Sequence, residues 1–307
     1  MAVIITTGYK YTDIDALACA VGYSELLSKK DIKNEIVLPG ILNHSVTESL
    51  KIKLNNIRTS IEVSPEDEFV IVDVSDPDQL PDFVNLQKVI NIFDHHAGFE
   101  DLWQEKIGKN SNIEMIGACA TLIYEEWVKN NLQNEMSQFT AELLLHAIVS
   151  NTLNFKIGIT SDRDRRAFEE LLNISNLSLG WIEKYFNEQE EGLYQDVIGT
   201  IINDTKGPDK EIEEDPLIFG QLELWNGFSF LENHKKDIEK AMEYFNEVSW
   251  LMSIPSISEG KNYLYAKDLR VISVLEEKLN VKFKDNVATT DRLLLRKQIR
   301  KLLNNYK

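Results

Sequence analysis

Two apolar runs, EFVIVDVSD at residues 68–76 and KVINIFDHH at residues 88–96, indicate the class of fold, and both end in acidic or histidine residues. Short runs rich in valine, isoleucine and phenylalanine are typical of buried strands. The same part of the chain holds two more such runs and two helical patterns, AVIITT (2–7), EIVLPG (35–40), ALACAVGYSELLSKK (16–30) and SVTESLKIKL (45–54). This alternation predicts βαβ units, and therefore an α/β fold with a mainly parallel sheet flanked by helices.

The rest of the sequence predicts a second, smaller domain. Apolar residues at three- and four-residue spacing predict that residues 116–205 are mostly helical. After residue 205, strand and helix patterns are mixed. A chain of 307 residues is long enough for two domains of about 100–200 residues each. We expect an N-terminal α/β domain over residues 1–190 and a C-terminal α+β domain over residues 191–307.

The composition is acidic and poor in cysteine. A net charge of −17 repels polyanions such as duplex DNA, so a nucleic-acid partner is not expected. Cys19 and Cys119 lie among small or apolar residues, which predicts buried, reduced thiols. The N-terminus lacks a signal-peptide pattern and no apolar run is long enough for a bilayer, so we expect a cytoplasmic protein without a membrane partner.

Three polar clusters each follow a predicted strand. They are Asp13 and Asp15 in YTDID, Asp73 in IVDVSD, and Asp94, His95 and His96 in NIFDHH. Because ligands of open parallel sheets bind outside the carboxyl ends of the strands, the clusters are expected to converge at one edge. Crowded carboxylates raise one another's pKa unless a cation neutralises them, and carboxylates with imidazoles suit Mn²⁺, Mg²⁺, Fe²⁺, Co²⁺ or Zn²⁺. The pattern predicts a site for one or two divalent ions.

Each cluster also has a purely structural interpretation. Asp13 or Asp15 can be the N-cap of the helix that follows, Asp73 can be a turn residue at the end of a strand, and an isolated Asp-His-His sequence can be incidental. The occurrence of all three clusters in this order favours the metal site.

The order of these motifs resembles that of the DHH phosphoesterases. Within that superfamily, the sequence is most similar to the branch of family II (manganese-dependent) inorganic pyrophosphatases and exopolyphosphatases. The similar segments are GYKYTDIDALACAVGY (8–23), GACATLIYEEW (117–127), AIVSNTLNFK (147–156), NDTK (203–206), FGQLEL (219–224) and RKQI (296–299). The resemblance implies a DHH-type phosphoesterase domain, a C-terminal DHHA2-like domain that holds the substrate, an active site between them, Mn²⁺ or Mg²⁺ as cofactor, and a homodimer.

The resemblance also implies a role for each residue of the three clusters. Asp13 would bind one metal ion, Asp15 and His95 would bind the other, and Asp73 would bridge both. Asp94 would orient the two histidines. His96 would face the substrate phosphate and assist the leaving group.

A cationic clamp in the second domain is implied in the same way. Lys206, Arg296 and Lys297 would neutralise the charge of the substrate phosphate. The clamp departs from the family pattern at Leu295, where the family has serine before the arginine.

Two expected metal ligands are replaced. The family has histidine where this chain has Tyr9, and aspartate where it has Asn151. Tyr9 is a weak ligand, because a phenol has a pKa of about 10, and it can instead contact an organic group of the substrate. Asn151 is also a weak ligand: it keeps a carbonyl oxygen but removes a charge, which lowers metal affinity and favours harder ions such as Mg²⁺.

We therefore expect a metal-dependent phosphohydrolase that acts on a phosphoanhydride or a small phosphate ester, with hydroxide generated at the metal attacking phosphorus. The alternative is a catalytically impaired protein that keeps the fold and binds a phosphorylated ligand. A nuclease for very short oligonucleotides is a third hypothesis. The charge of −17 and the absence of a Gly-Gly-Gly-His segment argue against it.

Overall fold

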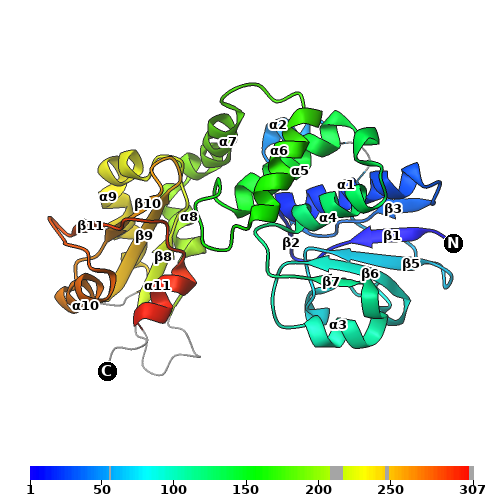
Figure 1. Ribbon diagram of the computed structural model, residues 1–307. Coiled ribbons are helices and arrows are strands. Elements are labelled where there is room, and N and C mark those ends of the chain that lie inside the picture. Colours follow the sequence, from blue (N-terminus) through cyan, green and yellow to red (C-terminus); the bar gives the residue numbers. More distant parts are fainter. Residues whose placement is uncertain (55–56, 208–216, 246–248, 304–307) are drawn as a thin grey trace. The chain divides into compact units, whose positions relative to one another are not determined.

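The chain forms two compact units, Met1–Tyr185 and Phe186–Lys307. The computed structural model describes residues 1–54, 57–207, 217–245 and 249–303. Each unit has a sheet and helices of its own, which confirms the predicted α/β class with a separate C-terminal domain of mixed structure (Figure 1). None of the helices in the described ranges is both long and apolar enough to cross a membrane.

The first unit is built on a parallel sheet of five strands in the order β3-β1-β5-β6-β7. Its strands, including the separate pair β2 and β4, are β1 (Val3–Thr6), β2 (Tyr11–Thr12), β3 (Asn34–Ile36), β4 (Ile41–Leu42), β5 (Glu68–Val72), β6 (Val89–Asp94) and β7 (Ser111–Ile113). Its helices are α1 (Ile14–Lys29), α2 (Glu48–Lys51), α3 (Glu100–Ile107), α4 (Cys119–Lys129), α5 (Gln138–Asn151), α6 (Asp162–Ile174) and the start of α7 (Trp181–Gln195), with 3-10 turns at Pro77–Gln79, Leu86–Lys88, Gly108–Asn110 and Gln133–Glu135. The prediction of a mainly parallel N-terminal sheet is confirmed.

Helices cover both faces of this sheet, as buried apolar strands require. Helices α1, α4 and α5 lie on one face and α3 on the other (Figure 1). Gly22 lets α1 approach its neighbours, because a Cβ there would lie 3.1 Å from Ile123 of α4 and 3.5 Å from Leu144 of α5. The Trp127 indole of α4 also donates to the carbonyl oxygen of Gly22 at 3.0 Å. These contacts pack the middle of α1 closely against α4 and α5.

One predicted helix is much shorter than expected. The pattern at residues 45–54 predicts a helix of that length, but α2 covers only Glu48–Lys51. Asn43 explains the late start, because its side chain accepts hydrogen bonds from both the backbone N–H and the hydroxyl of Ser45 and so forms a local turn.

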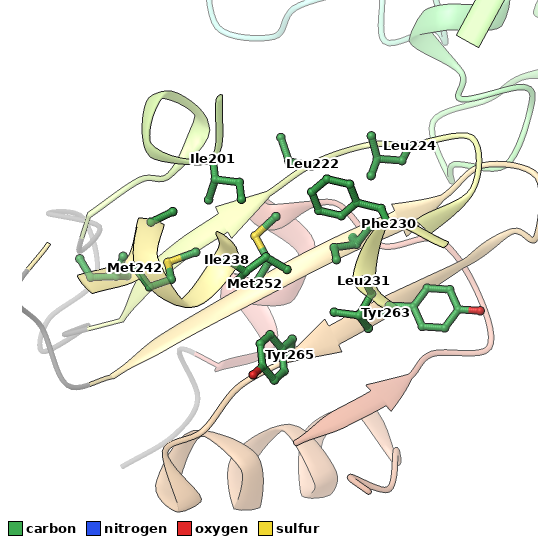
Figure 2. Packing of buried hydrophobic residues seen from close by; sticks show 13 residues of the cluster. Ile201, Leu222, Leu224, Phe230, Leu231, Ile238, Met242, Met252, Tyr263 and Tyr265 are labelled. Carbon is green, nitrogen blue, oxygen red and sulfur yellow. The ribbon is translucent and has the colours of Figure 1, made fainter. Parts of the chain in front are cut away.

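The second unit has a four-stranded mixed sheet in the order β11-β10-β9-β8, in which only β8 and β9 are parallel. Its elements are the rest of α7, α8 (Val197–Asp204), β8 (Ile218–Gln221), α9 (Gly227–Glu243), β9 (Trp250–Ser256), β10 (Lys261–Tyr265), α10 (Leu269–Leu279), β11 (Val287–Thr289) and α11 (Arg296–Leu303). Alternate residues of the strands enter two cores. Met252 and Tyr263 pack with α9 (Figure 2), whereas Leu251 and Leu264 pack with α10 and α11.

Candidate metal centre

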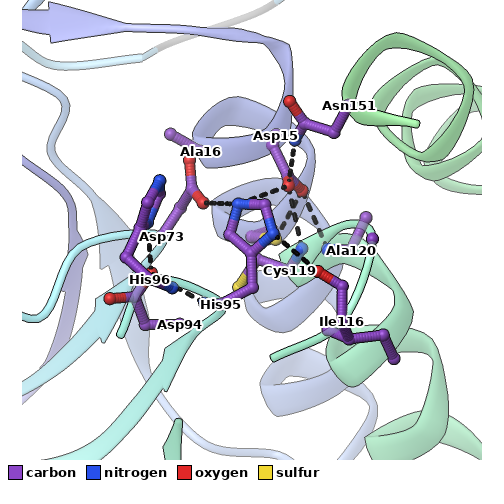
Figure 3. Close-up of polar contacts among 12 residues, drawn as sticks. Asp15, Ala16, Asp73, Asp94, His95, His96, Ile116, Cys119, Ala120 and Asn151 are labelled. Atoms are coloured by element: carbon purple, nitrogen blue, oxygen red, sulfur yellow. Dashed lines mark hydrogen bonds and ion pairs between the residues drawn. The ribbon is translucent and has the colours of Figure 1, made fainter. Parts of the chain in front are cut away.

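The three polar clusters follow adjacent strands of the parallel sheet. Asp15 lies in the first turn of α1, Asp73 directly follows β5, and Asp94 ends β6. The structure brings Asp15, Asp73 and His95 together (Figure 3): Nε2 of His95 is 3.4 Å from Oδ1 of Asp73 and 3.8 Å from Oδ2 of Asp15. Three side chains that are far apart in the sequence therefore share one site at the carboxyl edge of the sheet.

Asp73 is held in an unusual backbone conformation. Its φ angle is +57°, in the left-handed region that few residues other than glycine adopt, and its N–H donates to the carbonyl oxygen of Phe93 at 2.8 Å. Burial raises the pKa of Asp73 well above its usual value, and the charges of Asp13 and Asp15 add to the shift. The Oδ1 atom is buried and has no hydrogen-bond partner among the described residues. A buried acceptor of this kind is costly without a cation or donor.

Asp15 is fully buried, yet it is well supplied with donors. Its two oxygens accept the backbone N–H groups of Cys119 and Ala120, each at 2.8 Å. These are the first residues of α4, whose own N-cap residue, Ala118, contributes no side-chain cap. Burial raises the pKa of Asp15, whereas His95 and these two N–H groups lower it. Asp15 thus caps a helix that lies about one hundred residues along the chain.

Asp13 has a structural role as a helix cap, which was one of the two interpretations of its position in the sequence. It is the N-cap of α1, and its side chain accepts the N–H of Ala16 at 2.9 Å. Its carboxylate is half-buried and close enough to Asp73 for its charge to raise the pKa of that residue.

The two histidines have fixed ring orientations. Nδ1 of His95 lies 3.1 Å from the carbonyl oxygen of Ile116, which can only accept, so Nδ1 carries a proton and Nε2 faces Asp73. Nδ1 of His96 is bound to Oδ1 of the buried Asp94 at 2.8 Å, and this contact raises the pKa of His96. Asp94 also accepts the backbone N–H groups of both histidines.

The side chains of Asn151 and Tyr9, the two positions that depart from the family pattern, have different surroundings. Asn151, the last residue of α5, donates its amide to Oδ2 of Asp15 (Figure 3). The side chain of Tyr9 is 43% exposed, and the Lys10 ammonium lies 5.6 Å from its ring centroid. Within the described ranges, no hydrogen bond joins the Tyr9 hydroxyl to the aspartates of the site.

The donor set fits a divalent cation. Asp73, His95 and His96 each offer one ligand atom, and these atoms all lie within 4.8 Å of one another. Asp73 also has a buried carboxylate oxygen, Oδ1, without a hydrogen bond among the described residues, and His95 is oriented by a backbone carbonyl in the manner of metal-binding histidines. Imidazole with carboxylate suits Mn²⁺, Fe²⁺, Co²⁺ or Zn²⁺.

The predicted clamp residues all lie in the second unit. The Arg296 guanidinium donates to the backbone carbonyl oxygen of Asp204 at 2.7 Å and lies 3.2 Å from its carboxylate. Lys206 and Lys297 are exposed, and the backbone of Lys206 pairs with that of Phe219 in β8. The Arg296 guanidinium lies 6.0 Å from the centroid of the Phe219 ring. Lys206 and Arg296 therefore both lie close to Phe219.

Arg300 was not among the predicted residues. It is 6% exposed, and its guanidinium donates to the carbonyl oxygen of Gly207 at 2.7 Å and lies 5.7 Å from the Phe219 centroid. Arg296 and Arg300 are four residues apart on α11 and share one face of it, a spacing that the sequence already contains.

Comparisons with known proteins agree with this architecture. The profile described as "DHH family, N-terminal domain" matches residues 3–148. A Clostridium acetobutylicum protein named as a probable manganese-dependent inorganic pyrophosphatase is 26% identical over 314 residues, covering 96% of this chain and 95% of its own. A Lactobacillus acidophilus protein of the same name is 28% identical over 199 residues, or 64% of this chain. The aligned part spans only 60% of that relative's length.

Two solved structures share the fold. One from Methanococcus jannaschii, named as a "putative family II inorganic pyrophosphatase", has a TM-score of 0.63 at 23% identity and covers 99% of this chain and 98% of its own. An exopolyphosphatase-related protein from Bacteroides fragilis has a TM-score of 0.54 at 13% identity, with coverage of 99% and 91%. At these identities the similarity concerns the fold alone. The family assignment rests on the profile match, which identifies residues 3–148 as a DHH family N-terminal domain.

Proposed function

We propose that this protein is a metal-dependent phosphohydrolase that acts on a phosphoanhydride or a small phosphate ester. The observation that carries the proposal is the buried Oδ1 of Asp73, which has no hydrogen-bond partner among the described residues and lies 3.4 Å from Nε2 of His95. The names of the relatives make Mn²⁺ the first ion to test and Mg²⁺ the second.

The residues around this point support phosphate chemistry. A divalent cation held by Asp73 and His95, with Asp13 and Asp15 beside them, would neutralise the carboxylates and polarise a phosphate oxygen. Asp94 holds Nδ1 of His96 and leaves Nε2 of this exposed ring open to a ligand. Because the contact with Asp94 raises the pKa of His96, the imidazole is better able to carry the proton that a leaving oxygen requires. Lys206, Arg296 and Lys297 are proposed to bind the substrate phosphate.

The test is phosphate release by the purified full-length chain. Pyrophosphate, tripolyphosphate, nucleoside triphosphates and small phosphate esters would each be incubated with Mn²⁺ or Mg²⁺. We expect metal-dependent release from at least one of them, and a loss of about 100-fold or more in His96→Gln. The matched control is His234→Gln, because His234 lies on α9 of the second unit and pairs with Asp237. Absence of release from every substrate with either metal would refute the proposal.

The second candidate is a protein that binds a phosphorylated ligand without turnover. Two observations favour this candidate. The Asn151 amide donates a hydrogen bond to Asp15, and the Tyr9 side chain is exposed, so neither residue is placed as a metal ligand. Thermal stabilisation by pyrophosphate, without phosphate release after long incubation, would support this candidate over the first.

A further inference from the structure

One short segment of the chain contacts both Asp15 and His95 (Figure 3). The carbonyl oxygen of Ile116 lies 3.1 Å from Nδ1 of His95. The backbone N–H groups of Cys119 and Ala120 each donate to the Asp15 carboxylate at 2.8 Å. All of these backbone groups lie at the start of α4 or just before it. The path of this segment therefore sets the orientation of two side chains of the candidate metal centre.

Asp164, in the first turn of α6, is tied to the same segment. It is fully buried. Its Oδ2 accepts the N–H of Gly117 at 3.1 Å, and its Oδ1 accepts the hydroxyl of Thr121 at 2.7 Å. Gly117 directly follows Ile116, and Thr121 directly follows Ala120. Asp164 therefore holds the segment at two points, each next to a group that contacts His95 or Asp15.

Gly117 makes this close packing possible. A Cβ atom at this position would lie 2.6 Å from Oδ2 of Asp164 and 2.7 Å from Cγ2 of Thr152, and both distances are shorter than real contacts allow. Thr152 is the C-cap of α5. The segment is thus packed against both α6 and the end of α5, and it has little room to move.

Only part of the hydrogen bonding of Asp164 is local to α6. Asp164 and Ser161 form a capping box, in which Asp164 accepts the Ser161 N–H at 2.8 Å and its own N–H lies 3.3 Å from the Ser161 hydroxyl. The box requires only these contacts. The bonds to Gly117 and Thr121 are additional, and they reach residues 47 and 43 positions earlier in the chain. Bonds of this kind orient the groups that hold metal ligands in place.

We infer that Asp164 is a positioning residue of the metal centre. By holding Gly117 and Thr121, it keeps the carbonyl before α4 directed at His95 and the first N–H groups of α4 directed at Asp15. The inference rests on the proposed function only in requiring that the centre bind a divalent ion. Loss of Asp164 lets both side chains turn, and so weakens metal binding without removing a group of the centre itself.

The affinity of the full-length protein for Mn²⁺, measured by calorimetry well below the unfolding midpoint, tests this role. In Asp164→Ala we expect the dissociation constant to rise about 10-fold or more. Asp164→Asn should stay within about threefold of the wild type, because its amide oxygen can accept the two N–H groups while its nitrogen donates to the Thr121 hydroxyl. Thr121→Val removes one of the two bonds and should have an intermediate effect.

Ser161→Ala is the matched control. It removes the hydroxyl of the same capping box but keeps the bonds from Gly117 and Thr121 to Asp164. Its unfolding midpoint should fall by about 2–4 °C, while its affinity for Mn²⁺ stays within about threefold of the wild-type value.

An unchanged affinity in Asp164→Ala would overturn the inference. An equal loss in Asp164→Asn would do so too, because the charge of the carboxylate would then be the cause, as would an equal loss in Ser161→Ala, because the stability of α6 would then be the cause. Absence of Mn²⁺ binding in the wild-type protein would also overturn it. The expected pattern of affinities without any phosphate release would leave the inference standing and remove the proposed function. Phosphate release together with an unchanged affinity in Asp164→Ala would do the reverse.

Discussion

Single residues of the candidate metal centre have distinct structural roles. Asp13 caps α1, Asp15 caps α4, and Asp73 keeps a buried oxygen that has no hydrogen-bond partner among the described residues. The sequence shows all three only as acidic residues after strands, and each has both a structural and a metal-binding interpretation. Which interpretation applies depends on where the donors of other segments lie, and this information is not local in the sequence.

Replacing Asp73 should stabilise the metal-free protein. Asp73→Asn removes a buried charge, and asparagine tolerates the left-handed backbone conformation at this position. We expect the free energy of unfolding without metal to rise by about 1–3 kcal/mol, and the stabilisation by Mn²⁺ to disappear. Urea unfolding with and without Mn²⁺ measures both effects. If the metal-free variant were less stable than the metal-free wild type, the Asp73 carboxylate would have a favourable interaction in the folded protein that does not require a metal ion.

At the scale of elements, the N-termini of helices organise both units. Helix α4 receives its cap from Asp15, and α10 receives its cap from Asp268, whose carboxylate accepts the N–H of Arg270 at 2.9 Å and the guanidinium of Arg270 at 2.8 Å. The second kind of cap is predictable, because the capping residue directly precedes its helix. The first is not, because Asp15 and Cys119 are paired only through the packing of α1 against α4.

Removing the cap of α10 should lower stability in a way that depends on pH. Arg270 and Ser249 lower the pKa of Asp268 to about 2, below the usual value near 3.8. A lowered folded-state pKa adds stability that is present above about pH 4 and is lost as the pH falls toward 2. Asp268→Ala should therefore reduce the free energy of unfolding by about 1 kcal/mol at pH 7 and by less as the pH approaches 2.

Urea titrations at several pH values between 7 and 2 test this prediction. Glu277→Ala, at an exposed position of the same helix, is the control, and Asp268→Asn should keep most of the cap. A difference between wild type and Asp268→Ala that does not change with pH would mean that the ion pair contributes nothing.

At the scale of the whole molecule, charge bears on the choice of substrate. The net charge of −17 disfavours long polyanions, while one cation with a few lysines and arginines is enough for a small phosphate group. The chain also carries two units with separate cores, so the phosphate-binding residues proposed in the second unit have a stable framework of their own.

Short oligonucleotides should be poor substrates. We expect the rate of phosphate or nucleotide release from a trinucleotide to be less than about one tenth of the rate with tripolyphosphate at the same concentration and ionic strength. Parallel assays in Mn²⁺ at low and moderate salt provide the measurement. A trinucleotide rate equal to or above that for tripolyphosphate would revive the nuclease hypothesis.

The amino-acid pattern was sufficient to predict the class of fold, the parallel sheet and the edge at which Asp15, Asp73 and His95 meet. These features follow from local periodicity and from the rule that parallel strands present their carboxyl ends on one side. The partners of those residues could not be predicted in this way. That the Asn151 amide and the start of α4 satisfy Asp15, while Asp73 keeps an unsatisfied buried oxygen, depends on how α1, α4 and α5 pack. A hydrogen bond requires the donor–acceptor distance to be correct to within a few tenths of an ångström. These donors and acceptors come from segments about one hundred residues apart in the sequence, and only the folded chain sets the distances between them.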